Sequence, residues 1–405
     1  MADVVESLNS IHKEVFGDGV PDLVPAYAKV QQGVKFNKKK EMGLKYVQPV
    51  RLAYPGGFTQ ALGDGTAGAF ALNDAKSGIV KRAEVTASQI LLKDQMDYET
   101  AAKASAGGAK AFKEGTAFFY EGMQKSVRKR LESLLLYGNS SIGKVQTYTS
   151  GTPSITILVA EWAAGLWAGA EGMEIDVQSG ATSTVRGTVT VAGVDIESRI
   201  ITLSGTVTGC VANDLVYFKG GFATEMNGIY KVLTNASTMF NIDAAAYSLW
   251  KSSSKAVTAA LTFNDVKSAI SLAVNKGLDE DLTLFINPRT WDNLLTDLAG
   301  LRSTDKGDIK KLEYGAEEIV FHSQNGKVEV VAHNMIKESH ALGLCMPYWE
   351  RLGAADVTFG TPGFGQDMFR QIEGKAGIEA RAYSHQCIFS SAPAKNFIIT
   401  GIVNS

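Results

Sequence analysis

A single long amphipathic helix is the most constraining feature of the sequence, between Lys110 and Gly138. Oppositely charged residues such as Arg128 and Glu132 stand four apart on its other faces and support the helix. At roughly 1.5 Å per residue it would be about 42 Å long, so its apolar face needs a sheet or another chain packed along it. The apolar residues recur at steps near four, which places them on one face: Phe112, Phe119, Met123, Val127, Leu131 and Leu135.

The composition is that of an ordinary globular protein, with 45% hydrophobic and 20% charged residues among 405. This length allows two or three domains. A net charge of -2 gives no general attraction to nucleic acid or membrane. No stretch approaches the roughly 18 to 20 apolar residues of a membrane span, and the charged N-terminus does not resemble a secretory signal. Three distant cysteines, Cys210, Cys345 and Cys387, indicate a reducing compartment without a disulfide framework.

The region before the long helix is predicted to be an arm followed by a hairpin. Residues 1–45 are interrupted by proline and glycine, and are either a poorly ordered terminus or an arm that orders against neighbouring subunits. Within 46–92, the segments Tyr46–Leu52 and Ile79–Val85 alternate like paired strands around a glycine-rich tip. Such a hairpin has no core of its own, so we expect it to contact something outside its own domain. Asp94–Ala106 is predicted to be a short helix leading into the long one.

The segment after the long helix is predicted to hold a second helix and then a β-rich domain. Thr152-Pro153 is a helix start signal, and apolar spacing predicts a helix as far as Gly169. Residues 172–256 are rich in Thr, Val, Ile and Gly, which is typical of a small β-barrel or sandwich. Four strands are predicted there: Thr188–Val191, Arg199–Leu203, Asp214–Phe218 and Gly228–Leu233.

The remainder of the chain has an α+β pattern. A helix begins at Thr262 and ends at Gly277, and another follows Asn287-Pro288. The predicted strands are Leu282–Ile286, Glu318–Phe321, Lys327–Val331, Leu342–Cys345, Gly377–Phe389 and Phe397–Ile402.

Three groups of residues have the chemistry for a metal or catalytic site, but none has the spacing or the neighbours that such a site needs. His333 and His340 lack a carboxylate or cysteine at ligand spacing, which makes a metal site unconvincing. His385 and Cys387 could form a nucleophile pair, but on a strand they share a face among apolar neighbours. Asp305–Asp308 is too short and misspaced for a calcium loop.

Phosphate-binding features are equally weak. The glycine-rich run Gly360–Gly365 lacks the Gly-Lys-Ser/Thr end that holds phosphate and magnesium. Lys38–Lys40 and Lys306–Lys311 could contact phosphates, but solvated charge is the simpler interpretation. We therefore assign no catalytic, cofactor-binding or metal-ligating residue, and expect neither an enzyme nor a cofactor.

Taken in order, the elements resemble those of the major capsid proteins of tailed double-stranded-DNA bacteriophages, the Hong Kong ninety-seven fold. The resemblance rests on Tyr46–Leu92 as the extended E-loop and Lys110–Tyr137 as the spine helix of the peripheral P-domain. Leu282–Pro288 matches a strand-to-helix passage common in the family. The strands Val328–Asn334 and Ala341–Cys345 resemble the paired strands near the junction of the P-domain and the axial A-domain. The β-rich segment would be an insertion.

This resemblance implies a division of the chain and a function. The protein would be a structural subunit that assembles through hexameric and pentameric capsomers into an icosahedral shell around phage DNA. It would be made in the bacterial host cytoplasm and reside in the virion capsid. Its partners would be a separate scaffolding protein, a portal protein and packaged DNA bound non-specifically, with no membrane. The implied parts are an N-arm (1–45), E-loop (46–92), P-domain with spine helix (93–151), first A-domain part (152–171), inserted β-domain (172–256), A- and P-domain strands (257–345), and C-terminal P-domain strands (346–405).

Two other functions remain open from the sequence. One is an α+β enzyme with a β-barrel appendage, for which we find no catalytic motif. The other is a binding module in which the barrel reads oligonucleotides or glycans like an OB fold, with Tyr217, Phe218, Phe222 and Tyr230 as stacking aromatics. If the chain forms a shell, we expect the β-domain to fold alone and project from the outer surface.

Overall fold

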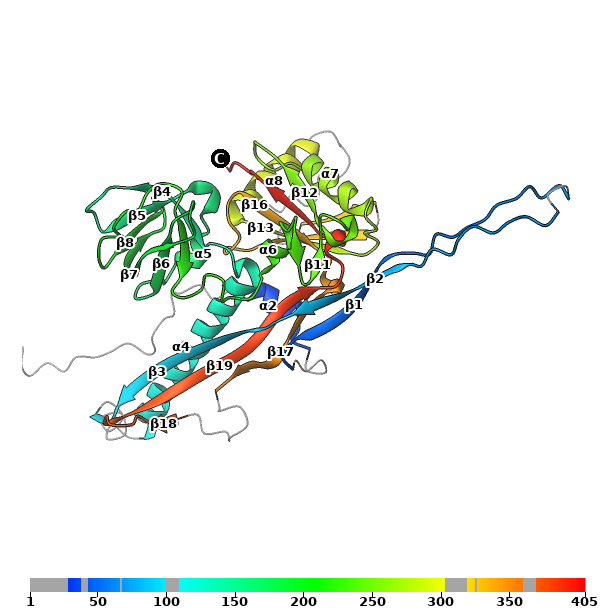
Figure 1. Ribbon diagram of the computed structural model, residues 1–405. Helices are drawn as coiled ribbons and strands as arrows, with labels where there is room; N and C mark the ends of the chain where they lie inside the picture. The colour runs from blue at the N-terminus through cyan, green and yellow to red at the C-terminus, as the bar shows by residue number, and fades with distance from the viewer. Residues whose placement is uncertain are drawn as a thin grey trace, which may run out of the picture.

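The computed structural model describes residues 28–37, 43–65, 68–99, 109–302, 319–324, 326–359 and 369–404. Figure 1 shows an elongated sheet beside a long helix, a barrel at one end, a second sheet with helices, and a hairpin that extends away from all of them. The shortest elements are α5 (Ala164–Trp167), β10 (Thr238–Met239), β11 (Ile242–Asp243) and the single-turn 3₁₀ helices η1 (Val159–Glu161), η2 (Ser248–Trp250), η3 (Met346–Tyr348) and η4 (Pro393–Lys395).

The predicted long helix is present as α4 (Ala109–Tyr137), 29 residues long. Met123, Val127, Leu131 and Leu135 are buried, as the apolar spacing predicts. The helix ends where the Gly138 N–H donates to the Leu134 carbonyl, 2.8 Å away.

An antiparallel sheet packs along this helix. Ala380 and Ala382 of its long strand β19 form a buried cluster with Met123 and Val127, so the apolar face of α4 is covered as expected. Strand β19 pairs with β17 and β18, and with β3 over ten residues from Gly377↔Asp97 to Gln386↔Ser88. The strands are β3 (Ser88–Asp97), β17 (Trp349–Thr358), β18 (Phe369–Gln371) and β19 (Gly377–Ser390).

Strand β3 corrects two boundaries. The predicted helix Asp94–Ala106 is wrong at its start, because residues 94–97 are strand and pair with β19. The hydrogen bonds that β19 offers outweigh the helix propensity of this charged segment.

The hairpin itself consists of β1 (Tyr46–Ala53) and β2 (Ile79–Val85), in register from Tyr46↔Val85 to Ala53↔Ile79. It therefore ends at Val85 rather than at Leu92, whose strand belongs to the elongated sheet.

A closed six-stranded barrel follows α4, in the order β4-β5-β8-β7-β6-β9. It spans residues 143–218, so the predicted boundaries 172–256 are wrong at both ends. The strands are β4 (Gly143–Tyr148), β5 (Ser154–Ile157), β6 (Glu174–Gln178), β7 (Val185–Asp195), β8 (Ile200–Leu203) and β9 (Leu215–Phe218).

The predicted helix from Thr152 to Gly169 is wrong, because its first half is strand β5. Ile155 and Ile157 alternate inward and are fully buried in the barrel. Branched side chains at successive positions favour a strand once a partner strand is available, and β4 and β8 flank β5. The Thr152 hydroxyl donates to the Thr149 carbonyl in a turn, at 2.6 Å, instead of capping a helix.

The segment after β9 belongs to the body of the molecule. The predicted strand Gly228–Leu233 is wrong: α6 (Ile229–Leu233) is a helix, and Ile229, Val232 and Leu233 are buried at helical spacing. Strand β12 (Ser253–Ala256) pairs in parallel with β20. Residues 229–256 therefore complete other layers and are no part of the barrel.

The second sheet has six strands in the order β12-β20-β16-β13-β15-β14. Its strand β20 also corrects the predicted C-terminal division, because 397–400 lies in this sheet and not in the elongated one. One face packs against helices α7 (Phe263–Val274) and α8 (Pro288–Arg302) around a core that includes Val266, Ile270 and Leu294. The remaining strands are β13 (Leu282–Ile286), β14 (Ile319–Ser323), β15 (Gly326–Ala332), β16 (His340–Leu344) and β20 (Phe397–Thr400).

A capping box explains why helix α7 begins where the sequence predicts. The Thr262 side chain accepts the Asp265 backbone N–H, and the Asp265 side chain accepts the Thr262 backbone N–H. Across the described ranges, no helix is both long and apolar enough to cross a bilayer.

Candidate functional site: an assembly surface

The outer part of the hairpin carries large apolar side chains that the described residues leave exposed. Tyr54, Phe58 and Leu72 are each 79% exposed, and Leu62 is 76% exposed. Figure 1 shows residues 54–78, the hairpin tip, extending away from the body. Exposed apolar surface costs about 25 cal/mol per Å² relative to burial, so a tip of this composition indicates a surface that another molecule covers.

The base of the hairpin, in contrast, is firmly attached. The ring of Tyr46 packs edge to face against the ring of Phe389, with 6.4 Å between the ring centres. The ring of Phe240 packs against Phe389 in the same way, at 5.3 Å. The Glu84 N–H donates to the Phe240 carbonyl at 3.0 Å. Phe240 and Asn241 have φ values of 51° and 63° in the two-residue turn between β10 and β11, a conformation that favours glycine. A constrained turn thus holds the hairpin at its root and leaves the tip free.

The short helix α2 (Lys29–Gly33) is anchored to α4 by Glu132. The Glu132 carboxylate accepts the N–H groups of Val30 and Gln31 at 2.7 and 3.0 Å. His333 Nε2 lies 2.9 Å from the same carboxylate, and both side chains are fully buried. The Lys29 amine donates to the Ala332 carbonyl at 2.7 Å. One buried carboxylate therefore joins the N-terminal segment, the long helix and the β15–β16 connection.

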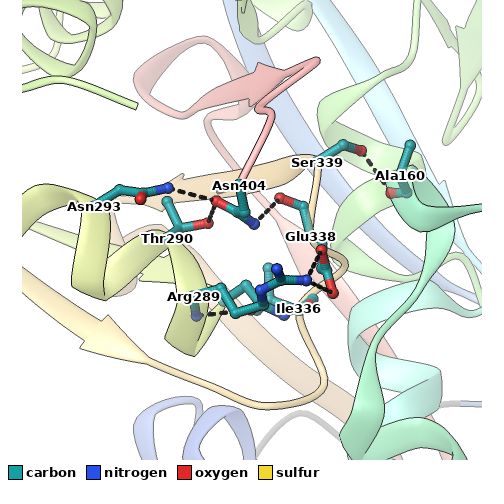
Figure 2. A network of polar contacts seen from close by, with 9 residues as sticks. Ala160, Arg289, Thr290, Asn293, Ile336, Glu338, Ser339 and Asn404 are labelled. Carbon is teal, nitrogen blue, oxygen red and sulfur yellow. Dashed lines mark hydrogen bonds and ion pairs between the residues drawn. The ribbon is translucent and has the colours of Figure 1, made fainter. Parts of the chain in front are cut away.

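The β15–β16 connection, residues 333–339, joins three parts of the molecule (Figure 2). Glu338 pairs with Arg289 of α8 at 3.1 Å, and its carbonyl accepts a hydrogen bond from Asn404 at 3.0 Å. The Ser339 hydroxyl donates to the Ala160 carbonyl, next to the barrel, at 2.7 Å. The connection thereby ties the barrel to the six-stranded sheet and to the C-terminal end.

Lys337 forms a second buried contact between the barrel and the body. Its amine lies 2.5 Å from Glu161 and donates to the Ser141 carbonyl at 2.8 Å. It also lies 4.7 Å from the ring centre of Tyr137. Burial acts to raise the pKa of Glu161, but its neighbours, Lys337 foremost among them, together outweigh burial and lower the pKa of that carboxyl. Burial raises the pKa of Tyr137 well above its ordinary value, so this phenol stays neutral.

Arg130 of α4 holds the barrel from the other side. Its guanidinium lies 3.0 Å from the ring centre of Phe218 in β9, and 3.7 Å from Glu225. Burial lowers the pKa of Arg130 to about 10, with Glu225 opposing this shift. A cation packed on an aromatic face and paired with a carboxylate gives a specific contact, so the barrel is fixed to α4 at a defined orientation.

The residues considered as sites in the sequence do not form one. His333 faces Glu132, whereas His340 stacks on Tyr230 at 4.7 Å. Among the described residues, no group of three or more His, Cys, Asp or Glu could hold a metal ion. Lys38–Lys40, Asp305–Asp308, Lys306–Lys311 and Gly360–Gly365 lie outside the described residues.

Cys387 and His385 do not act as a pair either. The Cys387 thiol is buried and donates to the Leu352 carbonyl at 3.4 Å. Burial raises the pKa of this thiol to about 12, which disfavours a reactive thiolate. His385 Nδ1 instead accepts the Ala354 N–H at 3.2 Å. The sequence analysis did not identify Glu132, Arg130 or Lys337 as contact residues, and it placed Glu132 away from the apolar face of the helix, four residues from Arg128. The one sequence signal for a buried Glu132 was its position directly after Leu131, next to the apolar face.

Comparison with known proteins gives a fold-level answer. No family model and no curated protein matches the sequence. Among solved structures, the capsid of cyanophage A-1(L) matches with a TM-score of 0.60 at 10% identity, covering 97% of this chain and 98% of that one. The chain has the phage capsid fold. Two further capsids, of the native and the empty GTA particle, match with TM-scores of 0.54 and 0.52 at 8% and 9% identity. They cover 99% and 97% of this chain, and 98% and 96% of theirs.

The match confirms the resemblance drawn from the sequence. The assignments of α4 as the spine helix and of the β1–β2 hairpin as the E-loop, which that resemblance implies, remain predictions. The match is not confined to one part of the chain, because the alignment spans 97% of it. The exposed hairpin tip, without a core in this chain, is then the natural candidate for a contact between subunits.

Proposed function

We propose that this protein is the major structural subunit of a phage head, which assembles into an icosahedral shell around double-stranded DNA. The full-length match to a phage capsid supports this function. The observation that carries it is the hairpin tip, where Tyr54, Phe58, Leu62 and Leu72 are largely exposed. A monomer gains nothing from such a tip, whereas a shell buries it against neighbours.

The alternatives find no support in the described residues. The buried thiols and paired carboxylates form no catalytic group, and no metal cluster occurs among those residues. An oligonucleotide or glycan reader would need exposed stacking aromatics on the barrel. Tyr217 and Phe218 are buried, Phe222 is 39% exposed in the loop that follows β9, and Tyr230 lies outside the barrel in α6.

Deleting the hairpin tip tests the proposal. We expect replacement of Gly56–Gly78 by a short turn to leave a folded monomer that cannot form shells, because β1, β2 and their base contacts remain. Assembly is followed by electron microscopy and sedimentation, and folding by circular dichroism. Normal shells from the deletion variant would contradict a role for the tip.

A milder variant separates tip chemistry from tip length. Phe58→Ser with Leu62→Ser removes apolar surface and keeps the backbone, and should reduce assembly. Gln60→Ser, in the same exposed segment, is the matched control and should assemble normally.

We extend the proposal to the partners of such a shell. It would contain hexameric and pentameric capsomers, a portal and packaged DNA, and a separate scaffolding protein would guide its assembly in the bacterial cytoplasm. The net charge of -2 gives no general attraction to DNA, so contact with packaged DNA would be weak and confined to local basic residues. Nuclease-protected DNA of genome length in purified particles would support the DNA assignment.

A further inference from the structure

Strand β12 forms one edge of the six-stranded sheet, and among the described strands it pairs only with β20. The Ser253 N–H donates toward β20, to the Asn396 carbonyl at 3.1 Å. Successive residues of a strand direct their backbone groups to opposite sides, so those of Ser254 and Ala256 point away from β20. Both residues are exposed, and neither N–H has a partner in the described part of the chain. An open edge of this kind is a template for another extended segment.

Three lysines surround this edge. Lys255 belongs to β12 and lies opposite Ile399 of β20, whose side chain is part of the core beneath helices α7 and α8. Lys251 comes four positions earlier and is exposed. The Lys276 amine, just after α7, donates to the carbonyls of Lys251 and Ser252 at 2.9 and 3.1 Å. Lysines from the strand, from the segment before it and from the end of the helix therefore meet beside β12.

These lysines carry positive charge that the neighbouring residues do not balance. Among the described residues, no carboxylate pairs with the amines of Lys251, Lys255 or Lys276. Burial first, and then the charge of Lys251, lower the pKa of Lys276 below its ordinary value. The second cause means that the two amines lie near enough to repel each other. A carboxylate placed beside them would relieve that repulsion, so the edge favours an acidic ligand.

The same lysines select against a second copy of this edge. Like charges directly opposite each other on paired strands destabilise the pair, and lysines on short edge strands keep such edges from joining each other. Two β12 edges in contact would bring their lysines together. A segment that supplies backbone groups and acidic side chains at once satisfies both the open edge and the unbalanced charge.

We propose that β12 receives an added strand from a separate protein, in the form of an extended segment whose acidic side chains pair with Lys251, Lys255 and Lys276. This inference goes beyond the proposed function and does not depend on it, because the edge belongs to the single chain. Strand β12 has four residues, of which Ser254 and Ala256 direct backbone groups outward. So short an edge gives little selectivity, and the lysines therefore supply it.

Fluorescence anisotropy with labelled peptides tests this contact in the full-length protein. The probe is an octapeptide of alternating Thr and Glu, in which Thr favours a strand and the acids share one side. An octapeptide of alternating Thr and Gln is the uncharged control. We expect the acidic peptide to bind and the uncharged one to fail, and binding to weaken as the NaCl concentration rises from about 50 to about 500 mM.

Two variants separate charge from backbone pairing. Lys251→Glu with Lys255→Glu reverses the charge at the edge and should weaken binding of the acidic peptide at least about tenfold. Ala256→Pro removes an outward N–H that the described residues do not use, a change that edge strands tolerate, and should abolish binding.

Lys267→Glu is the matched control for charge. Lys267 is exposed on α7, one turn before Ser271, whose hydroxyl accepts the Gln324 amide at 3.3 Å next to β14, the opposite edge of the sheet. This variant should bind the acidic peptide as the wild type does. Circular dichroism establishes that each variant is folded.

Equal binding of the acidic and uncharged peptides, or wild-type affinity in the charge-reversed variant, would overturn this inference. Wild-type affinity in a folded Ala256→Pro variant would overturn strand addition. Binding by unassembled chains that is lost in assembled shells would overturn the assignment to a separate protein, because a neighbouring copy would then cover the edge. Wild-type protein that forms no assembly under any condition would overturn the proposed function and leave this inference standing.

Discussion

The residues that connect the parts of the molecule are buried ionisable side chains, at positions where the sequence suggests an exposed surface. Glu132 and Lys337 are fully or almost fully buried, and each joins two or more parts of the chain. A buried charge is costly unless it is paired and hydrogen-bonded, and both are. These residues define how the parts sit together, because breaking one partner leaves the other charge uncompensated.

His340 should make the protein sensitive to acid. Burial, with the nearby charge of Lys337, lowers the pKa of His340 to about 3, although Glu161 opposes this. The unfolded histidine has a pKa of about 6.5, so between these values the unfolded state binds a proton that the folded state does not. Stability is therefore lost as pH falls from 6.5 toward 3. We expect about 2–3 kcal/mol from this residue between pH 7 and pH 4.5.

His340→Phe should remove this part of the acid loss and keep the ring against Tyr137 and Tyr230. The Nδ1 atom of His340 has no hydrogen-bond partner, so the variant sacrifices no bond at that atom. Urea unfolding at pH 7 and pH 4.5 measures the difference, with His385→Phe as the matched control. Equal acid losses in wild type and His340→Phe would contradict the assignment.

At the scale of elements, long periodic segments were predictable and short ones were not. Helices α4 and α7 and strands β13, β15 and β19 follow directly from apolar spacing and caps. Strand β5 and helix α6 have four and five residues, too few for a helical and a strand period to be distinguished. Segment 154–157 became a strand because β4 and β8 pair with it. Segment 229–233 became a helix that packs against α4.

The apolar face of α4 gives a prediction at this scale. Leu131 is fully buried, and Leu131→Asp would bury an unpaired charge at a cost of several kcal/mol. We expect insoluble protein. Leu131→Met, which conserves volume and costs less than about 1.5 kcal/mol, should stay soluble. Soluble Leu131→Asp with an unchanged melting temperature would mean that this face is open to solvent.

At the scale of the whole molecule, one core runs from the barrel into the body. Ile157 and Val177 of the barrel belong to the same buried cluster as Leu135 of α4 and Phe389 of β19. The barrel is therefore attached along its core side and by the Arg130 and Lys337 contacts. The outward projection expected from the sequence remains a prediction, since it concerns the shell.

The corrected boundaries predict which fragment folds alone. Residues 172–256 lack β4 and β5 and carry β12, so we expect them to be disordered in isolation. Residues 139–219 contain all six strands and should give a dispersed amide NMR spectrum and a β-type circular dichroism spectrum. A folded 172–256 with a disordered 139–219 would reverse this conclusion.

Local sequence patterns were enough to predict the order of the main elements, the long helix with its buried face, and the hairpin without a core. These follow from local periodicity and caps, which act over a few neighbouring residues. It also supported the resemblance to the phage capsid fold, because that resemblance depends on element order.

The folded chain was needed to establish where the barrel begins and ends and which charges are buried. Strands β4 and β5 come from one side of the predicted boundary, and β12 leaves to join β20. Glu132 meets Val30 and His333 across separations of 102 and 201 residues. Contacts between residues so far apart leave no periodic trace in the sequence, because only the folded chain brings them together.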